Sequence, residues 1–246
     1  MKPFIFSRCV LSGLVLACCL FAPQTQAAIV INGTRVIYPS DQKEISVKLD
    51  NNGESPLLVQ SWIDDGDARA TPDTARAPFV LTPPIARIES RKGQTLRVRF
   101  TGQESLPQDK ESIFWLNVLE VPPSSDDGQN KLKIAFRSRV KLFYRPVALQ
   151  LDTAQAAQKM QWRLTKNAGT WALEGNNPTP YYLSLSSIKV GSASAELDLI
   201  NSMFAPGEHK TLPLKGAVDA SESKQMKFSA INDYGGINAV TLPLAP

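Results

Sequence analysis

The chain has 246 residues, of which 43% are hydrophobic, and it carries a formal net charge of +4. This small positive balance does not mark a nucleic-acid-binding protein. The length allows a targeting segment followed by one large domain or two ordinary ones. Beyond the first residues no apolar run reaches 18 residues, so the sequence predicts no direct membrane insertion.

Residues 1–27 predict a signal peptide for secretion. Lys2 and Arg8 precede the apolar run "CVLSGLVLACCLFA", and "QTQA" then ends in a small residue. Cleavage before Ala28 would lower the net charge to +2, because the segment carries two basic residues and no acid. "VLAC" also resembles a lipoprotein-processing box, so lipidation of Cys18 stays an alternative. All three cysteines lie in this segment, which leaves the mature chain no disulfide to form.

Short alternating segments separated by turn residues follow Ala28 and predict one immunoglobulin-like β-sandwich over residues 28–146. The run "LTPP" favours an ordinary edge-strand break over a cis peptide bond at Pro83 or Pro84. The predicted strands of this domain are "TRVIYP", "EISVKLDN", "LLVQSWID", "TLRVRFTG", "SIFWLNVLEV" and "LKIAFRSRVKLFY".

A second series of short strands predicts another sandwich over residues 147–246. "TAQAAQKM" is expected to form a short helix capped by Asp152 or Thr153. Two sandwiches joined by a short link would leave a cleft between them. The predicted strands here are "VALQLD", "QWRLTK", "TWALEG", "YYLSLSSIKV", "HKTLPL", "KQMKFSAIND" and "NAVTLPL".

The sequence offers little catalytic chemistry. His209 is the only histidine and stands in an expected turn, "APGEHK". No nucleophile elbow, phosphate-binding loop or cysteine–histidine cluster occurs. "DDGD" at 64–67 is read as a turn, because the other positions of a calcium-binding loop are missing. We therefore expect neither an enzyme nor a cofactor or metal site.

The stretch "KLKIAFRSRVKLFYRP", residues 131–146, is unusually long for a sandwich strand. Its even positions are mostly apolar, including Leu132, Ile134 and Phe136, whereas its odd positions are mostly basic. The length indicates that part of this strand serves something outside its own domain. From the residues alone, Arg35 and Lys141 read as solvated strand residues.

Several motifs agree in their order along the chain: "TRVIY", "TPP", "LPQDKES", "FWLNVLEVPP", "VKLFYRP", "NPTPYY" and "INDYGG". Together they resemble the periplasmic chaperones of the chaperone–usher pilus pathway. The resemblance covers the whole mature chain. It implies an all-β fold of two immunoglobulin-like domains joined at an angle, with a cleft between them.

The resemblance also implies a function. Such a chaperone binds and folds pilus subunits by donor-strand complementation, a recognised form of strand addition. It caps their assembly surface and delivers them to an outer-membrane usher. The expected partners are therefore pilus subunits and the usher, and the empty protein is expected to self-associate. The alternative is a structural or adhesive immunoglobulin-like pilus or surface protein.

The family's site residues map onto matching motif positions of this chain. Arg35 and Lys141 would hold the C-terminal carboxylate of a subunit. The donor strand would place Leu132, Ile134 and Phe136 in the subunit's groove. An ion network between the domains would comprise Glu111, Arg145 and Asp233. Arg137 and Arg139 are expected to protect the strand edge from wrong pairing.

Overall fold

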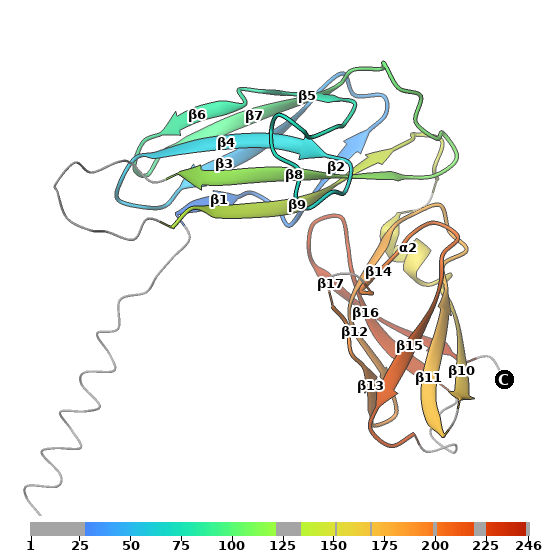
Figure 1. Ribbon diagram of the computed structural model, residues 1–246. Helices are drawn as coiled ribbons and strands as arrows, with labels where there is room; N and C mark the ends of the chain where they lie inside the picture. The colour runs from blue at the N-terminus through green and yellow to red at the C-terminus, as the bar shows by residue number, and fades with distance from the viewer. Residues whose placement is uncertain are drawn as a thin grey trace, which may run out of the picture.

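The computed structural model describes residues 28–121, 134–150, 152–167, 169–198, 201–218 and 225–244. They form two β domains, one after the other along the chain (Figure 1). Within these ranges, no helix has the length and hydropathy that crossing a bilayer requires.

The first domain consists of two sheets packed face to face. One sheet has the order β1-β3-β7-β5, and the other has the order β2-β9-β8-β4-β6. The first sheet contains β1 (Ile29–Ile31), β3 (Ile45–Asn51), β7 (Gly93–Phe100) and β5 (Phe79–Thr82). The second contains β2 (Arg35–Pro39), β9 (Phe136–Arg145), β8 (Ser112–Val121), β4 (Leu57–Asp64) and β6 (Ile85–Ile88).

Alternation of side chains builds the core between these two sheets. In β3, Val47 and Leu49 are at most 4% exposed, whereas Lys48 between them faces solvent. In β7, Leu96 and Val98 are buried in the same way. Successive side chains of a strand point to opposite faces, so the sequence pattern alone selects the buried face.

The second domain is one curled sheet with the strand order β10-β11-β15-β13-β12-β16-β17, in which β14 also pairs with β12. Trp162, Leu173, Tyr181, Phe204 and Phe228 form much of its core. Its elements are α2 (Thr153–Ala157), β10 (Gln161–Asn167), β11 (Thr170–Asn176), β12 (Leu183–Val190), β13 (Ala193–Ala195), β14 (Met203–Phe204), β15 (His209–Lys215), β16 (Gln225–Ile231) and β17 (Ile237–Pro243).

The predicted elements are largely confirmed, with four differences. Residues 147–152 were expected as a strand, but residues 147 and 148 form a turn and no strand forms at 149, 150 or 152; Leu151 lies outside the described residues. His209 begins β15 and does not stand in a turn. The peptide bond Thr82–Pro83 is cis, where an ordinary break was favoured; an X–Pro bond has only a small trans preference. The short strands β1, β5, β6, β13 and β14 were not predicted, because two to four residues carry too little periodicity.

The helix prediction is confirmed together with its cap. The Asp152 carboxylate accepts a hydrogen bond from the backbone N–H of Gln155 at 2.6 Å. This contact satisfies one of the donors that every helix leaves unpaired at its N-terminus.

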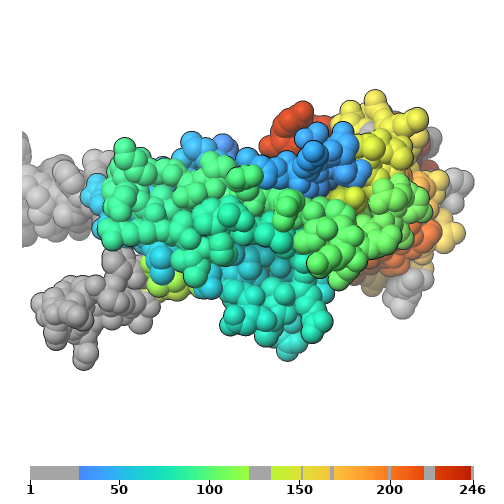
Figure 2. Space-filling view, turned by 90° about the horizontal axis from the view of Figure 1, so that it is seen from above, coloured from blue at the N-terminus to red at the C-terminus, as the bar shows by residue number. Residues whose placement is uncertain are grey.

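The second domain lies beneath one end of the first, at a large angle to it (Figure 1). Seen from above, the first domain fills most of the view, and the yellow and red residues of the second domain emerge at one end only (Figure 2). The predicted fold class of two immunoglobulin-like domains joined at an angle is confirmed.

Candidate functional site

Arg35 and Lys141 lie side by side although 105 intervening positions separate them in the sequence. They are direct partners in the parallel pairing of β2 with β9. Gly33, with a φ of +119°, lies just before β2 in a conformation that L side chains rarely adopt. The turn containing Gly33 separates β1 from β2 and starts the new strand at Arg35, next to β9.

Both cations reach across the junction to the second domain. Arg35 Nη1 donates to the carbonyl oxygen of Ile231 at 3.0 Å, and Lys141 Nζ donates to Ser184 Oγ at 3.1 Å. The Arg35 side chain also lies over the ring of Phe143, with its guanidinium carbon 5.9 Å from the ring centre. The two cations therefore face the second domain, where water is partly excluded.

The electrostatics of this pair favour an anion. Burial lowers the pKa of Arg35, and burial together with the charges of Arg35 and Lys210 lowers the pKa of Lys141 to about 8. Arg35 Nε is buried without a hydrogen-bond partner. No carboxylate of the described residues forms an ion pair with either cation. A carboxylate between them would supply an acceptor for that N–H and reduce the mutual repulsion.

The three residues assigned to an interdomain network are brought together. Arg145 Nε donates to Glu111 Oε1 at 2.6 Å, and its two terminal nitrogens donate to Asp233 at 2.7 and 2.8 Å. The second oxygen of Glu111 accepts from the backbone N–H of Tyr182 at 2.8 Å. Thr153 Oγ1 donates to Asp233 Oδ1 at 3.2 Å. Elements of both domains are thus joined through one guanidinium.

Burial acts differently on the two carboxylates of this network. It raises the pKa of Glu111 in spite of the nearby Arg145 charge. Burial also acts to raise the pKa of Asp233, but hydrogen bonds and the charge of Arg145 outweigh it and lower that pKa. Glu111 is only 2% exposed, so removal of Arg145 would leave a buried carboxylate without its counter-ion.

The even face of β9 changes from exposed to buried along the strand. Ile134, just before the strand, is 55% exposed, and Phe136 at its start is 57% exposed. Leu142 and Tyr144, on the same face, are at most 4% exposed in the core. Ile134 and Phe136 are therefore not packed in the core of their own domain, whereas Val140 further along already packs against it. Leu132 lies outside the described residues.

The first half of β9 also presents a strand edge. Residues 136–140 pair with β8 on one side, whereas β2 pairs only with residues 141–145. In the part of the chain that the structure describes, no strand covers the other side of 136–140. Exposed backbone donors and acceptors of this kind pair readily with another chain.

The odd face of β9 is packed and is not a plain solvated surface. Arg139 Nη2 donates to Asp64 Oδ1 at 2.5 Å, and the Arg139 guanidinium carbon lies 4.3 Å from the centre of the Trp115 ring. Arg137 lies over Trp62 at 5.4 Å. These partners were not predicted, although Trp62 and Trp115 in two predicted strands were an available signal. The proposed edge-protecting role of both arginines stays a prediction.

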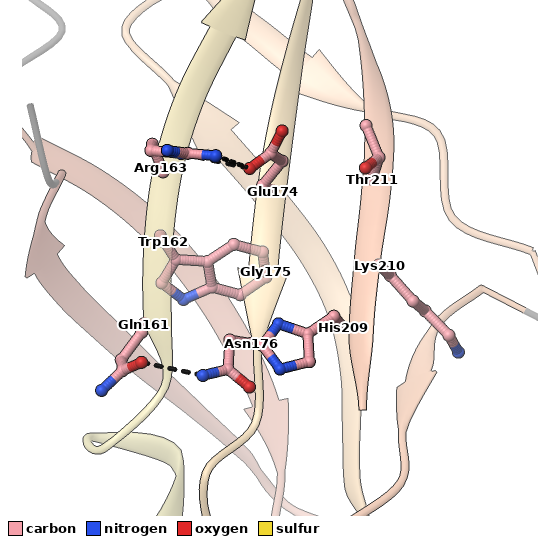
Figure 3. A pocket seen from close by; sticks show the side chains of 9 residues that line it. All are labelled: Gln161, Trp162, Arg163, Glu174, Gly175, Asn176, His209, Lys210 and Thr211. Carbon is pink, nitrogen blue, oxygen red and sulfur yellow. Dashed lines mark hydrogen bonds and ion pairs between the residues drawn. The ribbon is translucent and has the colours of Figure 1, made fainter. Parts of the chain in front are cut away.

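A shallow hollow of about 720 Å³ lies over β10, β11 and β15 of the second domain (Figure 3). Its polar side chains pair with one another: Arg163 with Glu174, and Gln161 with Asn176. His209 lines it and is exposed. Among the described residues, no group of histidine, cysteine and acidic side chains could hold a metal ion.

Both domains match families of pilus-assembly chaperones. Residues 28–150 match the family described as "Pili and flagellar-assembly chaperone, PapD N-terminal domain", and residues 155–242 match "Pili assembly chaperone PapD, C-terminal domain". The chain belongs to the PapD family of pilus-assembly chaperones. This membership supports the chaperone and not the structural or adhesive alternative.

Similar proteins agree with this assignment over nearly the whole chain. The probable fimbrial chaperone YadV of Escherichia coli K12 is 44% identical over 223 residues, which are 89% of this chain and 91% of YadV. The chaperone protein FimB/FhaD of Bordetella pertussis is 44% identical over 229 residues, 91% of each chain.

Two solved structures place the fold in the same family. The crystal structure of the YadV chaperone has a TM-score of 0.73 at 40% identity, covering 89% of this chain and 100% of that one. The SafB chaperone in complex with the SafA pilin of Salmonella enterica has a TM-score of 0.75 at 28% identity, covering 90% and 99%.

Proposed function

We propose that this chaperone binds pilus subunits in the periplasm, completes their fold by donor-strand complementation, caps their assembly surface and delivers them to an outer-membrane usher. Membership of the PapD family supports this. So does the similar SafB chain, whose structure is described as a chaperone in complex with a pilin. No bound cofactor is needed for such strand exchange.

One observation mainly supports the proposal that two cations bind the subunit's C-terminal carboxylate. Arg35 and Lys141 stand next to each other at the domain junction, and a buried N–H of Arg35 has no acceptor. A subunit's C-terminal carboxylate can accept several charge-assisted hydrogen bonds, each worth about 1.5–3 kcal/mol. A chain end occurs once per subunit, so gripping it fixes the position of the whole bound strand.

The donor strand then follows from that anchor. Ile134 and Phe136 are more than half exposed beside the uncovered strand edge, which suits them to enter a groove in the subunit. Leu132 is proposed as the third donor residue on the same face. A slip of one residue at the carboxylate would turn all these side chains away from the groove, so the anchor and the strand must act together.

Glu111, Arg145 and Asp233 are proposed to set the angle between the domains. Their ion pairs link the residue before β8 and the end of β9 in the first domain with the turn after β16 of the second. The angle matters because Arg35 and Lys141 touch the second domain through Ile231 and Ser184. We expect a buried network of this kind to contribute to the angle between the domains more than to the net free energy of unfolding.

The periplasmic location is proposed from the signal-like residues 1–27 and from the relatives, among them a structure described as the periplasmic chaperone SfaE. Domains spanning 28–146 and 147–246 would form the mature protein. Lipidation at Cys18 is the competing outcome, and mass spectrometry of the mature N-terminus separates the two.

The test is co-purification of subunits from the periplasm with single variants of the anchors. Arg35→Ala and Lys141→Ala should remain folded by circular dichroism and should lose the subunits that the wild-type chain retains. Arg97→Ala is the matched control, because Arg97 pairs with Glu44 on the exposed surface. Normal subunit yield in both anchor variants would contradict the proposal.

A further inference from the structure

Three neighbouring strands of the second domain present one row of residues to the junction. Ser184 on β12 is paired with Met203 on β14 at one side and with Ile231 on β16 at the other. Neighbouring strands lie about 4.8 Å apart, so the row is only about 10 Å wide. Each member of this row accepts a hydrogen bond from a different cation.

Two of these cations are the anchors of the first domain, Arg35 on Ile231 and Lys141 on Ser184. The third is Lys210 of the second domain, whose Nζ donates to the carbonyl oxygen of Met203. Figure 3 shows the Lys210 side chain directed away from Glu174 and Asn176. Lys210 therefore contacts the row through Met203, although it also lines the shallow hollow.

The charges around the row leave it positive. Glu111 and Asp233 are both engaged by Arg145. Glu208 lies 3.2 Å from Lys210 and also accepts a hydrogen bond from the backbone N–H of Ala205. Burial first, and then the charges of Arg35 and Lys210, hold the pKa of Lys141 at about 8, which agrees with Lys210 lying within electrostatic reach of Lys141.

We propose that Lys210 is a third cation of the carboxylate site, so that a bound chain end is held from both domains and not from the first domain alone. This rests on the proposed function of Arg35 and Lys141. Lys210 stands on the Lys141 side of the row, where its charge adds to the attraction for an anion. The ligand it recognises is the terminal carboxylate of an extended peptide.

The probe is a pair of synthetic peptides of alternating valine and threonine, one with a free C-terminal carboxylate and one amidated. Fluorescence anisotropy measures the ratio of their affinities for the full chain. The wild type should prefer the carboxylate, and Lys210→Met should reduce that preference about three- to tenfold, as expected for one partly screened charge. Lys210→Arg, which keeps the charge, should restore it.

Lys215→Met is the matched control, because Lys215 lies on the same strand with a 68% exposed side chain paired to Glu196. It should leave the preference unchanged. If Lys210 only stabilised β14 through Met203, its loss would weaken both peptides equally and leave the ratio as in the wild type. That result would overturn the inference.

The same experiment separates failure of the inference from failure of the proposed function. If Arg35→Ala and Lys141→Ala abolish the preference while Lys210→Met keeps it in full, Lys210 is not part of the site and the anchors stand. If the wild-type chain itself shows no preference for the free carboxylate, the anchor proposal falls and the role of Lys210 falls with it.

Discussion

At Phe136, the effect of a substitution on subunit binding can best be distinguished from its effect on folding stability. Its side chain is 57% exposed in the free chain, whereas Leu142 on the same face of β9 is fully buried. Complete burial of a large apolar side chain contributes about 1.5–3 kcal/mol. The exposed fraction leaves about 0.9–1.7 kcal/mol to be gained on binding, which corresponds to about four- to sixteenfold in affinity.

We therefore expect Phe136→Ala to weaken subunit binding by that factor and to leave the unfolding midpoint almost unchanged. Leu142→Ala should instead cost about 2–5 kcal/mol of folding free energy, because it opens a cavity in the core. Val80→Ala is the binding control, since Val80 is 43% exposed on β5 of the other sheet.

The assay is a biosensor titration of each chaperone variant with the subunit that co-purifies with the wild-type chain, beside urea unfolding followed by circular dichroism. An unchanged affinity in Phe136→Ala would refute the assignment of this residue to the donor strand. A large loss of stability would refute it as well, because Phe136 would then belong to the domain's own core.

Three further outcomes are expected. Arg145→Ala should cost about 3 kcal/mol or more in urea unfolding, because Glu111 is left buried without its counter-ion; an unchanged midpoint would contradict this. Subunit affinity should be constant between about pH 5, where the terminal carboxyl is ionised, and about pH 8. It should fall above pH 8, since Lys141 loses its proton there in the empty site and a bound carboxylate favours the charged form. Lys141→Arg should remove that dependence, and a wild-type affinity that stays flat to pH 10 would exclude the role of Lys141. The empty chain should self-associate as its concentration rises in analytical ultracentrifugation, and Phe136→Glu should remain monomeric. A strictly monomeric wild type would disprove that self-association covers the exposed edge of β9.

Much of the fold could be predicted because long strands show a clear alternation of apolar and polar residues in the sequence. In β3 and β7 the alternation of buried and exposed side chains spans seven and eight residues. The same rule failed at "VALQLD": apolar residues alternate there, but residues 147 and 148 form a turn after β9. An alternation over six residues does not distinguish a strand from a surface segment without regular structure.

The candidate site depends on contacts that alternation does not encode. Nothing in the spacing of Arg35 and Lys141 reveals that they are paired in a parallel ladder; the family resemblance supplied their connection. The sequence likewise gave no sign of the acceptors Ser184 and Ile231, which come from the second domain. Side chains that meet only when two domains dock need a structure to bring them together.

The packing on the odd face of β9 shows the same limit. Arg139 was expected only to protect the strand edge, yet it is paired to the fully buried Asp64 and lies over Trp115. Charge predicts exposure only when no buried partner exists. Asp64 ends both the predicted strand "LLVQSWID" and β4, but nothing in "DDGD" reveals its pairing with Arg139.

The most direct test of the whole account is the affinity of the chaperone for one subunit whose C-terminus is native, amidated or lengthened by one residue. We expect the altered termini to weaken binding by about 10- to 100-fold, the loss of one charge-assisted hydrogen bond or slightly more. In a Lys141→Ala background that difference should shrink. Equal affinity for all three termini would contradict the claim that Arg35 and Lys141 align the donor strand by holding the subunit's final carboxylate.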